Sequence, residues 1–310
     1  MGQLIDGQWV VGSIVRSDKK GNFDRPPSVF SDVIAADHPR YQPASGRYHL
    51  YVSYACPWAT RALIMRELMN LAPHLPVHVV HPDILEKGWS FDTGFTGATG
   101  DGLYGLSYLY ELYQKAQSDV TSRVTVPVLW DSQTQTIVNN ESQQIIRILN
   151  TAFADMTGVR TDYYPAAHRK AIDDWNAQIY PCVNNGVYRC GFAKTQEAYE
   201  AAAADLFACL DKLDDHCARH DYLVADQLTE ADIRLIVTLL RFDLVYYVHF
   251  KTNLRKISEY PHLFRYVKAL YEIKAIRNSH NFAHIKRHYY YSHEHLNPYR
   301  IVPVGPASFL

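Results

Sequence analysis

The chain of 310 residues is long enough to bury the cores of two domains, and its net charge of −1 argues against a nucleic-acid-binding protein, which needs a basic surface to neutralise phosphates. No apolar run has the length of a membrane span, and the first residues lack the basic and apolar regions of a signal peptide. Five scattered cysteines in so large a chain favour a reducing compartment over a disulfide framework, so we expect a cytoplasmic protein that binds neither nucleic acid nor membrane.

Residues 1–45 contain several glycines and prolines, which interrupt regular structure. We therefore predict an irregular segment. Its aromatic residues Trp9, Phe23 and Phe30 indicate that the segment packs against the rest of the protein.

The next segment predicts a strand, a tight turn and a helix. Residues 48–52 alternate with the period of two that is typical of a strand. Pro57 suits the first position of a helix, because proline has no N–H to leave unpaired there. Ile64, Leu68 and Leu71 then form an apolar stripe at helical spacing.

Cys56 stands directly before this predicted helix. Free N–H groups and the positive end of the helix dipole stabilise an anion at that position, so the pKa of a thiol there can fall from about 8.5 into the range of roughly 3.5–7.5. Residue 59 is Ala, so no second thiol follows in a Cys-x-x-Cys motif, and a disulfide at Cys56 would have to form with an outside molecule. The alternative is a buried structural cysteine.

Further elements complete an α/β unit. Residues 76–80 predict a short parallel strand, and residues 123–130 and 136–138 predict a hairpin. Pro127 conflicts with a strand interior, where it cannot donate a hydrogen bond; a cis peptide there would expose neighbouring backbone groups to a ligand. Glu141 and Ser142 open a helix. The long glycine-rich loop 88–102 lacks the Gly-Lys-Ser/Thr sequence of a phosphate-binding loop.

The second half of the sequence is helical. Residues 166–184 and 195–220 predict helices, Thr229 to Asp232 form a capping box, and Tyr260-Pro261 open a further helix. We expect a domain at 1–155 and an all-helical domain with an extended tail at 156–310. His280, His284 and His288 follow one another at intervals of four, as metal ligands on a helix can, but without a nearby carboxylate pair we expect solvated side chains and no metal.

Five motifs give the sequence a specific resemblance: residues 53–59 around Cys56, 88–91 with Trp89, 97–101, 123–130 with Val126-Pro127, and 184–188 with Tyr188. Together they resemble the glutathionyl-hydroquinone reductases, the cysteine-type, xi-class glutathione transferases. The resemblance covers nearly the whole chain. It implies an α/β plus all-α protein, with a thioredoxin-like N-terminal domain followed by a glutathione-transferase-type helical bundle.

The resemblance also implies an activity, with glutathione as co-substrate. The Cys56 thiolate attacks the sulfur of an S-glutathionyl-hydroquinone, Tyr188 protonates the leaving carbon, and a second glutathione releases oxidised glutathione from the Cys56 mixed disulfide. Tyr246 and Tyr289 would hydrogen-bond the Cys56 sulfur. The glutathione-binding residues implied are Trp89, Arg123, Val124, Thr125, Val126, Glu141 and Ser142. A homodimer acting on glutathionylated aromatic substrates is expected.

Two other interpretations stay open. An omega-type thiol transferase or dehydroascorbate reductase also uses a lone Cys-Pro at a helix start, but would not need the 89–102 loop or the Tyr188 motif. A non-catalytic domain of the same fold would bind partners or hydrophobic ligands, and its Cys56 would have an ordinary pKa. With 23 tyrosines in the chain, any one tyrosine is more often a packing residue.

Overall fold

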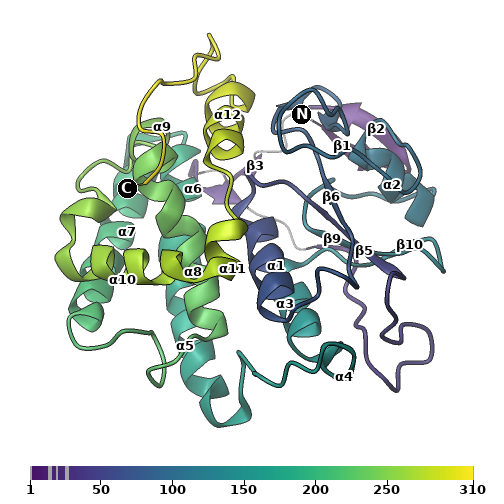
Figure 1. Cartoon of the computed structure of the whole chain (residues 1–310). Helices are drawn as coiled ribbons and strands as arrows, with labels where there is room; N and C mark the ends of the chain where they lie inside the picture. Colours follow the sequence, from purple (N-terminus) through teal and green to yellow (C-terminus); the bar gives the residue numbers. More distant parts are fainter. Residues whose placement is uncertain (1, 13–15, 19, 25–27, 310) are drawn as a thin grey trace. The chain divides into compact units, whose positions relative to one another are not determined.

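The computed structural model describes residues 2–12, 16–18, 20–24 and 28–309 (Figure 1). The chain forms two compact units. The first unit consists of Met1–Ile14, Pro26–Thr161 and Ser279–Arg300, and the second of Val15–Arg25, Asp162–Asn278 and Ile301–Leu310. These units are defined by internal contacts. The division into domains 1–155 and 156–310 stays a prediction.

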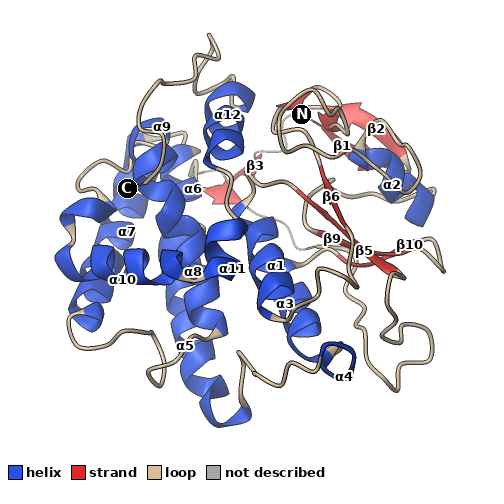
Figure 2. Cartoon of the chain, in the orientation of Figure 1, coloured by secondary structure: helices blue, strands red, loops and turns tan. Residues whose placement is uncertain are grey.

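The first unit has an α/β architecture (Figure 2). Its elements are β1 (Gly2–Ile5), β2 (Gln8–Val11), β5 (Tyr48–Val52), α1 (Pro57–Leu68), β6 (Val77–Val79), β7 (Ile84–Leu85), β8 (Gly88–Trp89), α2 (Leu109–Ala116), β9 (Val128–Asp131), β10 (Thr136–Asn139), α3 (Ser142–Thr151), α4 (Ala154–Thr157) and α12 (Phe282–Ser292).

A four-stranded sheet in the order β10-β9-β5-β6 organises this unit. β5 pairs in parallel with β6, and α1 connects them, which confirms the predicted βαβ arrangement. β9 pairs antiparallel with both β5 and β10, which confirms the predicted hairpin. The helices α1 and α3 pack together on one side of the sheet, and α2 lies on the other side (Figure 1). Cys56 therefore follows a central strand of the sheet.

All five residues of β5 are buried. The alternating sequence of residues 48–52 is typical of a strand with one solvent-exposed face, but β5 lies between two other strands and has covered faces. His49 stays buried because its Nδ1 atom lies 2.9 Å from Nε2 of His78 on β6. The polar side chains of β5 therefore find partners inside the protein instead of facing water: His49 contacts His78, and the hydroxyl of Tyr51 donates to Asp101 at 2.9 Å.

The prediction that residues 1–45 are irregular is wrong in two places. β1 and β2 form a hairpin, and residues 16–17 pair antiparallel with residues 23–24. The packing prediction is confirmed for two aromatic residues. Trp9 stacks on Tyr110 with ring centroids 4.9 Å apart, and Phe30 meets the ring of Tyr113 edge-on at 5.9 Å. The side chain of Phe23 lies outside the described residues. The β1–β2 hairpin was not predicted, because four-residue strands give too short a pattern to recognise.

The second unit is mainly helical (Figure 2). Its elements are β3 (Arg16–Ser17), β4 (Phe23–Asp24), the 3-10 helix η1 (Ala166–His168), α5 (Arg169–Ile179), the π-helical turn η2 (Tyr180–Asn184), α6 (Gly186–Gly191), α7 (Gln196–Cys217), α8 (Glu230–Arg241), the π-helical turn η3 (Phe242–Tyr246), α9 (Tyr247–His249), the 3-10 helix η4 (Ile257–Glu259), α10 (Pro261–Glu272) and α11 (Lys274–Asn278).

The helix α8 forms the centre of this unit, and all twelve of its residues are buried. Its predicted capping box is confirmed: the amide and hydroxyl of Thr229 both donate to one carboxylate oxygen of Asp232 at 2.8 Å. The other oxygen of Asp232 accepts from Tyr266 at 2.9 Å, so Asp232 has a structural role. Among the described residues, no helix combines the length and the apolar character that crossing a membrane requires.

Candidate active site

Cys56 lies at the N-cap of α1, directly after β5. Pro57 occupies the first helical position, as predicted. The carbonyl oxygen of Cys56 accepts hydrogen bonds from the amide and the hydroxyl of Thr60, both at 3.0 Å, so the turn that carries the cysteine is fixed to the helix. The side chain of Cys56 is half-buried. The helix dipole and the free N–H groups of the first turn therefore act on an accessible sulfur.

The thiol of Cys56 donates a hydrogen bond to the carbonyl oxygen of Val126 at 3.5 Å. The Val126-Pro127 peptide bond is cis, and β9 begins only at Val128. Pro127 thus precedes the strand, which removes the conflict between a proline and a strand interior. This contact brings together two of the sequence-predicted site residues, Cys56 and Val126.

The segment before the proline is anchored to α2 through one tyrosine. The hydroxyl of Tyr113 donates to the carbonyl oxygen of Thr125 at 2.8 Å and accepts from the amide of Thr125 at 3.2 Å. Asn140 donates a third hydrogen bond to the same hydroxyl at 3.1 Å. Both backbone polar groups of Thr125 are thereby engaged inside the protein. Val124 and Val126 have buried side chains, while Arg123 is half-buried.

Glu141 and Ser142 lie at the start of α3, as predicted. Glu141 is the N-cap, and its carboxylate accepts hydrogen bonds from the amide of Gln143 at 3.3 Å and from the hydroxyl of Ser142 at 3.4 Å. Ser28, distant in sequence, donates to the other carboxylate oxygen at 3.2 Å. The N-terminus of a helix attracts a carboxylate ligand, and a fixed glutamate beside it can accept an ammonium group.

Arg61 links the two helix starts. The arginine is buried in α1, and its Nη1 atom donates to the hydroxyl of Ser142 at 3.4 Å. Its guanidinium group also lies 4.5 Å from the ring centroid of Trp58. A buried positive charge thus stands next to the first residue of α3, where it adds to the positive end of the helix dipole.

Trp89 lies in β8 and is 5% exposed. Its ring stacks on the imidazole of His288 on α12, with centroids 5.0 Å apart and an angle of 19° between the planes. Tyr289, the next residue of α12, is 1% exposed and meets the His288 ring edge-on at 5.3 Å. Trp89 and Tyr289 both belong to the compact unit that contains Cys56.

The structure brings the other two predicted tyrosines together in the second unit. The rings of Tyr188 on α6 and Tyr246 on η3 are 5.9 Å apart, and each lies 5.3 Å from the ring of Phe250. Tyr246 is fully buried, whereas Tyr188 is half-buried. Tyr246 ends a π-helical turn, a rare geometry that is frequent at functional sites.

The expectation of solvated histidines is wrong for two of the three. His284 is fully buried and His288 is 9% exposed, while His280 is half-buried. His284 lies 2.9 Å from the carbonyl oxygen of Thr96 through Nε2, so this ring binds the glycine-rich loop. Within the residues described, no cluster of three His, Cys, Asp or Glu side chains has the arrangement of a metal site.

Comparison with known proteins places these features in a family. Residues 55–152 match the N-terminal domain of glutathione S-transferases, and residues 196–269 match the C-terminal domain. The glutathionyl-hydroquinone reductase YqjG of Escherichia coli is 48% identical to this chain, over 99% of the chain and 95% of the relative. The chain belongs to the glutathionyl-hydroquinone reductases, the xi class of the glutathione transferases.

Solved structures agree with this assignment to the reductase family. The xi-class enzyme of Phanerochaete chrysosporium superposes with a TM-score of 0.91 at 48% identity, covering 94% of this chain and 95% of that one. The glutathione-bound YqjG of E. coli superposes with a TM-score of 0.90 at 46% identity, covering 98% and 96%. The predicted thioredoxin-like domain followed by a helical bundle is confirmed.

Two residues that lie beside the predicted site were not predicted from the sequence. Tyr113 sits in an amphipathic helix, where a tyrosine most often packs, and only the fold reveals its three hydrogen bonds. Arg61 carries a better signal, because it lies between the apolar residues 57–59 and 62–65 of one helix, where a charged side chain needs a buried partner.

Proposed function

We propose that this reductase converts S-glutathionyl-hydroquinones to hydroquinones, with glutathione as co-substrate and Cys56 as nucleophile. The observation that carries the proposal is the position of the Cys56 sulfur, at the start of α1 and 3.5 Å from the carbonyl oxygen of Val126. A glutathionyl group whose cysteinyl main chain pairs with Val126 carries its sulfur toward Cys56. The relationship to YqjG supports the same substrate class.

The reaction proceeds in two displacements. The Cys56 thiolate attacks the sulfur of the substrate, and a Cys56–glutathione disulfide forms as the carbon–sulfur bond breaks. The bonding electrons pass to the aromatic carbon, which takes a proton, and we assign its delivery to Tyr188 as general acid. A second glutathione, as thiolate, then attacks the mixed disulfide, restoring Cys56 and releasing oxidised glutathione. The aromatic carbon is reduced, and two glutathione sulfurs are oxidised.

The remaining assignments follow the chemistry of each position. Hydrogen bonds from Tyr246 and Tyr289 to the Cys56 sulfur would favour the thiolate. The start of α3 suits the γ-glutamyl group, with Ser142 and the helix N–H groups for its carboxylate and Glu141 for its ammonium. The glutathione-binding set is Trp89, Arg123, Val124, Thr125, Val126, Glu141 and Ser142.

We also propose that the protein acts as a homodimer in the cytoplasm. Its five cysteines form no disulfide with one another, which suits a reducing compartment where glutathione is plentiful. Light scattering on the purified protein tests the dimer: a mass of one chain overturns it.

Turnover tests the function. A glutathionyl-hydroquinone is mixed with excess glutathione and one of three proteins: native protein, Cys56→Ala, or Cys182→Ala. The last is a matched control at another half-buried cysteine. We expect free hydroquinone and oxidised glutathione from the native protein and from Cys182→Ala, and neither product from Cys56→Ala. Disulfide exchange without carbon–sulfur cleavage would instead indicate an omega-type thiol transferase.

A further inference from the structure

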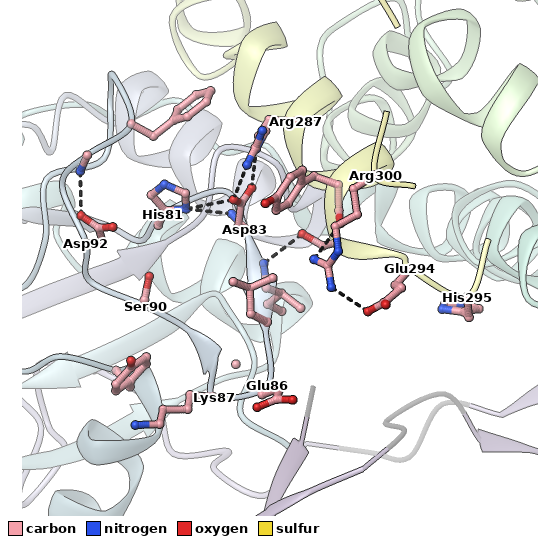
Figure 3. A pocket seen from close by; sticks show the side chains of 18 of the residues that line it. His81, Asp83, Glu86, Lys87, Ser90, Asp92, Arg287, Glu294, His295 and Arg300 are labelled. Carbon is pink, nitrogen blue, oxygen red and sulfur yellow. Dashed lines mark hydrogen bonds and ion pairs between the residues drawn. The ribbon is translucent and has the colours of Figure 1, made fainter. Parts of the chain in front are cut away.

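The helix α12 holds the segment 82–97, which carries Trp89, through four polar contacts. The amide of Ile84 donates to the hydroxyl of Ser292 at 2.9 Å, and His284 contacts the carbonyl oxygen of Thr96 at 2.9 Å. Arg287 donates two parallel hydrogen bonds of 2.8 Å to Asp83 (Figure 3). His288 supplies the fourth contact. The helix therefore determines where this segment lies.

The imidazole of His288 is fixed on two sides. Its Nδ1 atom lies 2.8 Å from the carbonyl oxygen of Pro82. A carbonyl oxygen only accepts hydrogen bonds, so Nδ1 carries the proton and donates. The face of the same ring stacks on the indole of Trp89 at 5.0 Å. A ring with a fixed tautomer and a fixed orientation gives the indole a rigid surface to pack on.

The hairpin that carries Trp89 has little rigidity of its own. It consists of β7 and β8, two strands of two residues each, paired at Ile84–Trp89 and Leu85–Gly88 and extended by one hydrogen bond, from the amide of His81 to the carbonyl oxygen of Ser90 at 2.9 Å. A hairpin this short is marginally stable in isolation. The orientation of the Trp89 side chain must therefore come from its neighbours, and His288 provides a parallel ring.

We propose that His288 is a positioning residue, which holds the Trp89 indole in the orientation that binds glutathione. This inference rests on the proposed function through its assignment of Trp89 to the glutathione site. His288 acts through Trp89, on whose ring its own ring stacks. Its ring face is the feature that matters, while its hydrogen bond to Pro82 orients that face.

A double-mutant cycle on the full-length protein tests the proposal. The ligand is S-methylglutathione, a thioether that binds without forming a disulfide, and calorimetry gives its dissociation constant. The variants are His288→Ala, Trp89→Ala and the double variant. We expect His288→Ala to weaken binding about fivefold, the equivalent of one lost aromatic contact. The double variant should bind no more weakly than Trp89→Ala alone, because His288 has nothing left to position.

Two further variants separate positioning from general loosening of the segment. His288→Phe keeps a stacking ring without the hydrogen bond, and we expect it to restore most of the affinity that His288→Ala loses. His284 lies on α12, one turn before His288. His284→Ala therefore removes a different contact of the same helix, the one with Thr96. We expect that variant to lower the melting temperature and to weaken binding less than His288→Ala does, because it leaves the ring that faces Trp89 in place.

Several outcomes overturn the proposal. Additive losses in the cycle would mean that His288 does not act through Trp89. An equal loss of affinity in His284→Ala would mean that the segment is simply loosened. Unchanged affinity in Trp89→Ala would remove both the proposal and the assignment of Trp89. Turnover by the native protein, measured in the same preparation, tests the Cys56 chemistry separately. A failure of the positioning proposal can therefore be told apart from a failure of the proposed function.

Discussion

The sulfur of Cys56 lies 3.5 Å from the carbonyl oxygen of Val126, although the two residues are 70 positions apart in the sequence. The contact joins the helix start that activates a thiol to the backbone segment that can pair with a peptide. In the proposed function, the nucleophile and the glutathione-binding backbone are therefore in direct contact. If Val126 binds the glutathionyl group as proposed, that group needs little further movement to present its sulfur to Cys56, which is the entropic advantage of a positioned substrate.

We predict that alkylation at neutral pH modifies Cys56 first. Burial raises the pKa of Cys182, and it raises the pKa values of Cys190, Cys209 and Cys217 to about 12. The helix start should instead lower that of Cys56. Iodoacetamide labelling followed by peptide mass spectrometry measures the five rates across pH. Equal rates for all five thiols in the folded protein would contradict the prediction, and urea-unfolded protein provides the reference.

Tyr113→Phe should destabilise the protein and weaken glutathione binding. The substitution leaves the amide and carbonyl of Thr125 without their partner, at a cost of about 1–3 kcal/mol, and it frees the segment that leads to Val126. Urea unfolding gives the stability, and the KM for glutathione reports on the segment. Tyr110→Phe, on the same helix with its ring stacked on Trp9, is the control. Indistinguishable behaviour of the two variants would refute the role given to Tyr113.

Arg61→Met should weaken glutathione binding about tenfold, because a buried positive charge beside the start of α3 is lost. Methionine keeps much of the apolar stem of the side chain. Arg66→Met is the matched control on the same helix, since Arg66 binds the carbonyl oxygens of Leu75 and Ala72. Native affinity in Arg61→Met, with unchanged folding, would show that the charge does not act on the ligand.

Stability should fall as the pH drops from about 6.5 to about 4. Burial, followed by the neighbouring His49, lowers the pKa of His78 to about 4. Between its ordinary value and that pKa, the unfolded chain binds a proton that the folded chain does not, so acid favours unfolding. The full contribution is present above pH 6.5 and amounts to at most about 3 kcal/mol. Urea unfolding at several pH values should show that the free energy of unfolding depends less on pH in His78→Gln than in the native protein. The same pH dependence in both proteins would refute the role given to His78.

Much of the fold was predictable because strong local signals agree with one another. The strand, Cys56 and Pro57 form a local strand–helix signal, and the Thr229–Asp232 box marks a helix start whatever the surroundings. The motifs of the family then placed these elements in a thioredoxin-like domain and a helical bundle. The N-terminal hairpin was not predicted, since strands of four residues show almost no periodicity in the sequence.

The histidines show why parts of the site were not predictable. Spacing alone offered metal ligation or solvation for His284 and His288, and the structure gives neither. Their partners, Thr96 and Trp89, lie almost 200 residues earlier in the chain. Contacts between such distant segments depend on how the elements pack, which periodicity along one helix does not report. The hydrogen bond between Arg61 and Ser142 was not predicted for the same reason, because it joins two helices that are distant in the sequence.

The most direct test of the central claim is a single-turnover experiment without free glutathione. Native protein in excess is mixed with a glutathionyl-hydroquinone, and both products are measured by mass spectrometry. We predict one hydroquinone released per substrate and one glutathione bound by a disulfide to the peptide that contains Cys56. Release of hydroquinone with no adduct on Cys56, or an unchanged yield in Cys56→Ala, would contradict the claim that this cysteine is the nucleophile.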